Sequence, residues 1–158
     1  MKIAILYDSK FGNTKKIAEF LATEGRTAGH ETQLFRTTKT KASAINTFQP
    51  EAIMVGGPTH FGKPTSTLIK YVKKLGKIEH SSTIRKAAVF NCYTGEEVTK
   101  AMKGQISDSL PNIELLDQVF PVLTGDQTGD NWNKIFLPPN WKGDAKSFLS
   151  AFLNFLSH

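Results

Sequence analysis

Residues 2–14 read Lys-Ile-Ala-Ile-Leu-Tyr-Asp-Ser-Lys-Phe-Gly-Asn-Thr, an apolar run that enters a short polar turn. Residues 3–7 predict a buried strand, and apolar residues at helical spacing follow Thr14. A strand-to-helix turn presents backbone N–H groups without intrahelical partners, and the helix dipole adds positive potential there. The turn therefore suits an anion, usually a phosphate. The alternative is an ordinary turn with a good helix cap.

The side chains of this turn fit a phosphate-binding role. Ser9 and Thr14 offer hydroxyl groups. Gly12 lets the backbone approach a ligand closely, and Asn13 tolerates an unusual φ. The complete turn consists of Ser9, Lys10, Phe11, Gly12, Asn13 and Thr14.

The composition indicates one soluble globular domain, which we expect to span residues 1–158. Hydrophobic residues make up 39% of the chain, enough for a core that needs no disulfide. The net charge of +6 attracts acidic partners. Because the lysines are dispersed, a solvated basic surface is favoured over a nucleic-acid groove.

The single cysteine, Cys92, excludes an internal disulfide and fits a reducing compartment. We expect it to be a buried small hydrophobe rather than a reactive thiol. The first strand begins within two residues, which leaves no room for a signal peptide, and no apolar run reaches membrane-spanning length. These features predict a cytoplasmic protein without membrane insertion.

Strand and helix patterns alternate along the chain. Short apolar strands separated by helices predict an α/β fold, a three-layer doubly wound sandwich with a parallel sheet between two helical layers. The predicted strands are 3–7, 31–36, 52–55, 84–90 and 113–123, and the predicted helices are 14–28, 42–48, 65–75, 98–106 and 144–156.

Three unusual turns fall where predicted strands end. Besides the first turn, residues 56–62 (Gly-Gly-Pro-Thr-His-Phe-Gly) follow the third strand, and residues 91–95 (Asn-Cys-Tyr-Thr-Gly) follow the fourth. In open parallel sheets, ligands bind beyond the carboxyl ends of the strands, where the strand order reverses. The three turns therefore predict one shared ligand site.

These three turns resemble those of the flavodoxins and related FMN proteins, and the resemblance covers essentially the whole chain. Residues 9–14 resemble the family's phosphate loop, Ser/Thr-x-Thr-Gly-x-Thr, and residues 56–62 resemble its Gly-Ser-Pro-Thr loop beside the flavin ring. Residues 91–95 fall where the family wraps the far side of the ring. Phe11 stands where flavodoxins place a threonine, as in quinone-reductase-like and flavodiiron relatives, so one phosphate hydrogen bond must come from elsewhere.

The resemblance implies a five-stranded sheet in the order 2-1-3-4-5 and FMN as the cofactor. Tyr93 would stack on one face of the flavin, and His60 or Phe61 would cover the other. It implies no catalytic side chain and no metal. The implied cofactor-binding residues are Ser9, Lys10, Phe11, Gly12, Asn13, Thr14, Pro58, Thr59, His60, Phe61, Gly62, Asn91, Cys92, Tyr93, Thr94 and Gly95.

Rival motifs are weaker. Residues 57–63 fit the start of a nucleotide P-loop, Gly-x4-Gly-Lys, but Pro64 lacks the hydroxyl that would hold magnesium. No G-x-G-x-x-G follows the first strand, so the dinucleotide fingerprint is absent. The histidines lack metal-ligand spacing, either with one another or with Cys92.

The sequence therefore predicts an FMN-binding electron-transfer protein that exchanges electrons with redox proteins, acidic ones given its own basic charge. Phe11 and that charge also fit a small NAD(P)H-dependent quinone or flavin reductase on the same fold. A non-redox binding module that has lost the cofactor is a third alternative. We expect the loop 124–142, with Trp132 and Trp141, to pack against the body of the domain.

Overall fold

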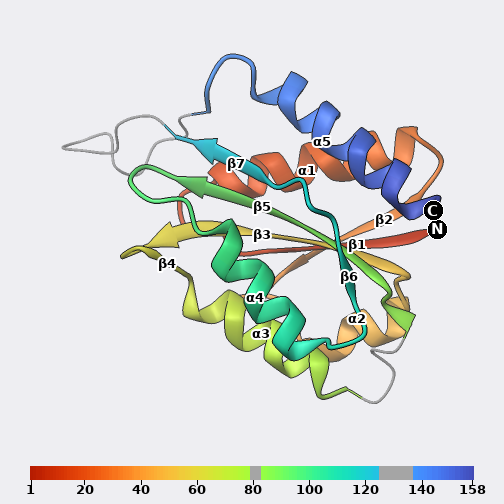
Figure 1. Ribbon diagram of the computed structural model, residues 1–158. Helices are drawn as coiled ribbons and strands as arrows, with labels where there is room; N and C mark the ends of the chain where they lie inside the picture. Colours follow the sequence, from red (N-terminus) through yellow and green to blue (C-terminus); the bar gives the residue numbers. More distant parts are fainter. Residues whose placement is uncertain (79–82, 125–136) are drawn as a thin grey trace.

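The computed structural model describes residues 1–78, 83–124 and 137–158, and its centre is a mainly parallel sheet (Figure 1). The spatial order of the sheet is β2-β1-β3-β5, followed by β6 and β7, which both pair with β5. The predicted order 2-1-3-4-5 is thus confirmed, with β6 and β7 sharing the fifth position. The predicted count of five strands is not, because β4, which pairs antiparallel with β3, was not expected. The strands are β1 (Lys2–Tyr7), β2 (Glu31–Arg36), β3 (Ala52–His60), β4 (Lys63–Pro64), β5 (Lys86–Tyr93), β6 (Glu114–Leu115) and β7 (Phe120–Leu123).

Helices cover both faces of the sheet (Figure 1). α1 (Asn13–Thr27) and α5 (Trp141–Leu156) lie on one face, while α2 (Ser43–Phe48), α3 (Ser66–Gly76) and α4 (Thr99–Ser109) lie on the other. Side chains of β1 alternate between the two resulting cores. Ile3 and Ile5 pack with α1 and α5, and Leu6 packs with the opposite layer. β1 is therefore buried on both faces, as its apolar run predicts.

The predicted third strand was too short. β3 continues through Gly56, Gly57 and Pro58, which pair in register with Phe90, Asn91 and Cys92 of a β5 that is also longer than predicted. Glycine and proline are turn signals in sequence, but a parallel neighbour keeps this segment extended. A Cβ on Gly56 would lie 2.0 Å from the Phe90 ring, so this glycine makes room for an aromatic side chain.

The predicted fifth strand, 113–123, is divided in two. β6 pairs with the start of β5 and β7 with its end. Two residues, 88 and 89, separate the paired Ala87 and Phe90 on β5, whereas four, 116–119, separate their partners Leu115 and Phe120. The longer segment cannot stay in register, so it leaves the ladder between β6 and β7.

Trp141 opens α5, three residues before the predicted start of that helix. It packs edge-on against Phe20 of α1, with ring centroids 5.1 Å apart, so it packs against the body as expected. Most of the loop 124–142, Trp132 included, lies outside the described residues. Within the described ranges, no helix is both long and apolar enough to cross a bilayer.

Two glycine substitutions test the packing of β3 against β5. We expect Gly56→Ala to lower the free energy of unfolding by about 2–3 kcal/mol, because the new methyl group overlaps the Phe90 ring. Gly104→Ala, in α4 with nothing within 4 Å of its Cβ position, should raise it by up to about 1 kcal/mol. Urea unfolding measures both. Equal effects of the two variants would contradict this packing.

Candidate functional site

A cavity of about 470 Å³ opens at the carboxyl ends of β1, β3 and β5. Most of the residues implied by the sequence line it, namely Ser9, Lys10, Phe11, Asn13, Thr14, Pro58, Thr59, His60, Cys92, Tyr93 and Thr94. The implied residues that do not line it are Gly12, Phe61, Gly62, Asn91 and Gly95. The sequence reasoning missed the lining residues Asp8, Arg36, Thr38, Thr65, Ser66, Thr67 and Thr124.

The turn from β1 to α1 is organised around the Ser9 hydroxyl. Ser9 Oγ accepts hydrogen bonds from the backbone N–H groups of Gly12 and Lys15, each at 3.2 Å. Gly12, at φ 102°, adopts the left-handed conformation that glycine favours and directly precedes α1. The start of α1 therefore lies at the cavity, with Asn13 and Thr14 in the lining, where the sequence predicts a phosphate-type turn.

Arg36 adds positive charge to this end of the cavity. Its Nη2 donates to the Ser9 carbonyl oxygen at 2.7 Å, which braces the turn from the end of β2. The buried Arg36 Nε has no hydrogen-bond partner among the described residues, so a donor remains for a ligand. Lys10 also lines the cavity, and Asp8 is the only acidic residue among the described lining residues, so the described lining favours an anion.

Asp8 ties β1 to the start of α3. Its Oδ2 accepts hydrogen bonds from Thr65 Oγ1 at 2.6 Å and Thr67 Oγ1 at 2.5 Å. Asp8 N also donates to the Gly56 carbonyl oxygen at 3.1 Å. These bonds hold the phosphate-type turn and the segment after β3 in one frame. The position of Asp8, directly after a buried strand, was a signal that the sequence reasoning passed over.

Asn91 joins the two loops at the other end of the cavity. Its side chain is fully buried behind the lining. Nδ2 donates to the Gly57 carbonyl oxygen at 2.9 Å, and Oδ1 accepts from Val98 N at 3.1 Å. Thr59 Oγ1, 3.3 Å from the Asn91 amide, donates to the Glu96 carbonyl oxygen at 2.7 Å. The end of β3 and the loop before α4 are therefore fixed relative to each other.

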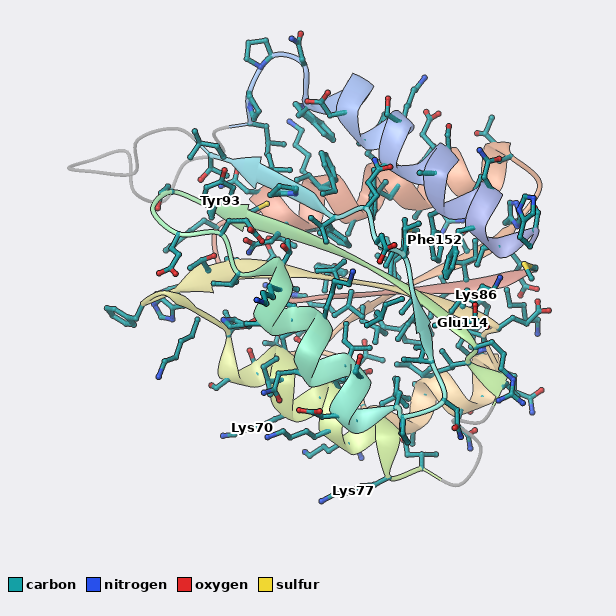
Figure 2. All side chains as sticks on the ribbon, viewed as in Figure 1. Lys70, Lys77, Lys86, Tyr93, Glu114 and Phe152 are labelled. Carbon is teal, nitrogen blue, oxygen red and sulfur yellow. The ribbon has the colours of Figure 1, made fainter. Side chains whose placement is uncertain are left out.

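The aromatic residues near this end take different positions. Tyr93 ends β5, is partly buried and lines the cavity (Figure 2). His60 ends β3 at the rim. Phe61 is 93% exposed and stacks against the outer side of His60, with ring centroids 4.6 Å apart. Tyr93 and His60 could thus flank a flat ring, while the implied flavin contact of Phe61 stays a prediction.

Cys92 lines the cavity but is only 4% exposed. Burial raises the pKa of its thiol to about 11, although a hydrogen bond with Thr14 partly opposes this. The thiol is therefore neutral near pH 7 and poorly nucleophilic, in agreement with the sequence prediction. The described ranges contain no group of His, Cys, Asp and Glu side chains that could hold a metal.

This arrangement defines a class of protein. A doubly wound sheet with a polar turn between β1 and a helix N-terminus, and two more loops around the same crevice, is typical of nucleotide- and flavin-binding α/β domains. The sequence profile of the flavodoxin domain family matches residues 4–125, so the chain belongs to that family of flavin-binding redox domains.

Individual relatives agree with this family. The chain is 25% identical over 130 residues to the coenzyme F420H2 oxidase of Methanothermobacter marburgensis, a match that covers 80% of this chain and 32% of the oxidase. A flavodoxin mutant from Pseudomonas aeruginosa superposes with a TM-score of 0.74 at 18% identity, covering both chains completely. The rubredoxin:oxygen oxidoreductase of Desulfovibrio gigas superposes with a TM-score of 0.68 at 20% identity, covering 99% of this chain and 37% of the other. The chain thus spans about a third of the curated relative.

Replacing Asn91 by alanine tests the link between the two loops. The change leaves Val98 N and the Gly57 carbonyl oxygen without their buried partner, so we expect a loss of about 2–3 kcal/mol in the free energy of unfolding. Hydrogen exchange at Val98 should also accelerate. Asn154→Ala, at an exposed site on α5, is the control and should change stability by less than about 0.5 kcal/mol. Equal stability of both variants would show that the buried amide does not couple the loops.

The raised pKa of Cys92 predicts a pH dependence. Native protein should react slowly with iodoacetamide near pH 8, and the rate should rise only as the pH approaches about 11. The buried neutral thiol should make its full contribution to the free energy of unfolding below the ordinary pKa of 9.0. That contribution should fall between pH 9.0 and about 11, because the thiol of the unfolded chain ionises first. Cys92→Ala should remove this component. Rapid native alkylation at pH 8 would contradict the burial of the thiol.

Proposed function

We propose that this chain binds FMN and carries electrons between redox proteins. The main support is that one cavity joins an anion-binding turn to an end flanked by Tyr93 and His60. FMN has the matching shape, with a phosphate at one end and a flat ring at the other. The single buried cysteine further supports a reducing compartment, which we propose to be the cytoplasm.

The phosphate would lie in the turn between β1 and α1. A helix N-terminus supplies amides without intrahelical partners. The Ser9 hydroxyl, the Thr14 hydroxyl, which also bonds the Cys92 thiol, and Arg36 Nε lie at the same end of the cavity. Phe11 provides no hydroxyl, but the lining contains further hydroxyls that the sequence reasoning did not include. These belong to Thr38, Thr65, Ser66 and Thr67, of which Thr65 and Thr67 already donate to Asp8.

The flavin would supply the redox chemistry, and the protein would supply binding, orientation and electrostatics. Tyr93 and His60 would exclude water from the faces of the ring. The Asn91 network would hold their two loops at a fixed separation. In this proposal no side chain of the chain donates or removes electrons.

A second candidate is a small NAD(P)H-dependent quinone or flavin reductase. Lys10 and Arg36 in the cavity lining support it, because both would attract an anionic nucleotide. Steady-state oxidation of NADPH with a quinone separates the two functions. A carrier shows almost no turnover without a separate reductase.

FMN titration of the purified protein tests the main proposal. Wild-type protein should bind FMN at least about 100-fold more tightly than riboflavin. Riboflavin lacks the phosphate, so its complex would lack at least two charge-assisted hydrogen bonds that the FMN complex has. Gly12→Ala should weaken FMN binding at least about tenfold, since a side chain at φ 102° disturbs the turn. Gly29→Ala, at φ 87° beyond the far end of α1, is the matched control and should leave affinity unchanged. Equal affinities for FMN and riboflavin would refute the phosphate site.

A further inference from the structure

Phe61 occupies an unfavourable backbone position. β3 and β4 form a hairpin in which His60 pairs with Lys63, so Phe61 and Gly62 form a two-residue turn. Their φ values are 51° and 67°, the combination of a type I′ turn. Such turns favour Asn-Gly, and a bulky side chain at positive φ is strained. The turn itself therefore gives no reason for phenylalanine.

The packing of Phe61 gives no reason for it either. Its side chain is 93% exposed and touches no core, although it stacks on the neighbouring His60. A strained residue that also leaves a large apolar side chain in water is destabilising twice over. Such outliers are typical of functional positions. The hairpin thus presents an aromatic ring to solvent at the rim of the cavity.

The surface next to this hairpin is basic. Residues 52–78 contain no Asp or Glu but five lysines, of which Lys63 belongs to the hairpin. Figure 2 shows Lys70 and Lys77 extending from α3 away from the sheet. No ion pair joins the α3 lysines to an acidic side chain within the three described ranges. We name the exposed lysines of α3 and the one that follows it the α3 lysine face, namely Lys70, Lys73, Lys74 and Lys77.

The α3 lysine face begins about one helical turn from the cavity and continues along α3 away from it. Ser66, the first residue of α3, lines the cavity, and Lys70 follows about one helical turn later. Glu96 is the acidic residue close to the hairpin, since a Cβ on Gly62 would lie 3.1 Å from its Oε2. Glu96 belongs to the loop before α4, so it leaves the α3 face uniformly basic.

We propose that the β3–β4 hairpin and the α3 lysine face form the docking surface for an acidic electron-transfer protein. Phe61 would be the apolar anchor, and Lys63 with the α3 lysines would orient the partner's carboxylates over the cavity mouth. The electron-transfer role of this surface rests on the proposed function. Docking itself requires only the hairpin and the helix.

An acidic protein fits this surface better than a membrane or a nucleic acid does. A membrane-surface helix presents apolar residues beside its lysines, whereas Leu68, Val72 and Leu75 of α3 are buried in the core. Single-stranded nucleic acid favours a groove with several stacking aromatics, and here one ring stands at a hairpin tip. A small apolar centre with a charged margin is typical of a protein interface.

Phe61→Asn tests the anchor, because asparagine suits a type I′ turn. Stability should be equal to or higher than that of the wild type, and the rates are compared with both proteins saturated with FMN. The probe is rubredoxin, a small acidic iron–sulfur protein. The FMN-loaded protein is reduced with dithionite, freed of excess dithionite and mixed with oxidised rubredoxin, so that one electron passes to the ferric iron. Stopped-flow measurement should show the second-order rate constant reduced about tenfold. An unchanged rate or a lower stability would each overturn the assignment of Phe61 as the anchor.

Paired neutralisation tests the lysines. The double variant Lys70→Gln/Lys73→Gln should slow the reaction with rubredoxin severalfold at low salt. It should accelerate the reaction with cytochrome c, which is basic. Both effects should become smaller as salt is added. Lys142→Gln/Lys146→Gln removes the same charge from α5, on the opposite face of the sheet (Figure 1), and should change either rate little. Equal effects of the two pairs would mean that net charge alone acts, which overturns the docking surface.

Calorimetric titration with oxidised rubredoxin measures docking without electron transfer. Suppose that the wild-type protein does not bind FMN but does bind rubredoxin, and that Phe61→Asn abolishes rubredoxin binding. The docking surface would then stand and the proposed function would fail. Single-stranded oligonucleotide and phosphatidylserine vesicles serve as further probes. Binding of either that depends on Lys70 and Lys73, in the absence of rubredoxin binding, would reassign the surface and overturn the proposal.

Discussion

The site depends on how the chain leaves the central strand. β1 is buried on both faces, so the position of Tyr7 and Asp8 is fixed by both cores. Directly afterwards, Ser9 Oγ accepts two backbone hydrogen bonds and Gly12 takes a left-handed conformation. These two features place the start of α1, with Asn13 and Thr14, in the lining of the cavity. A different turn at this point would leave the fold intact but change this end of the cavity.

The rest of the site is held by buried polar groups. Asp8 fastens the start of α3, Arg36 braces the Ser9 carbonyl, and Asn91 connects the end of β3 with the loop before α4. Each of these side chains satisfies backbone or hydroxyl groups that would be costly to bury alone. The cavity walls are therefore preorganised. Among the described residues, the non-glycine residues with positive φ are Phe61, at the hairpin tip, and Gln49, at the end of α2, and neither lines the cavity.

The sequence predicted what depends on local patterns. Apolar runs located the strands of the sheet, and the turn 9–14 marked one end of the cavity. Contacts between segments that are distant in the sequence could not be predicted from these local patterns. The Gly56–Pro58 segment looked like a turn because nothing in the sequence reveals that β5 continues beside it. Asn91 was expected to touch the ligand, yet it lies behind the lining. Thr65 and Thr67 reach the site only because the hairpin turns the chain back toward Asp8.

The central claim is that donors at the β1–α1 turn bind the phosphate of a flavin nucleotide as a dianion. Phosphorus-31 NMR of the protein with one equivalent of FMN tests this directly. Bound in the turn, the phosphate should give a resonance that does not move between about pH 5 and pH 8, because the donors favour its fully charged form. A resonance that titrates near its ordinary second pKa of about 6 would show a solvated phosphate and contradict the account.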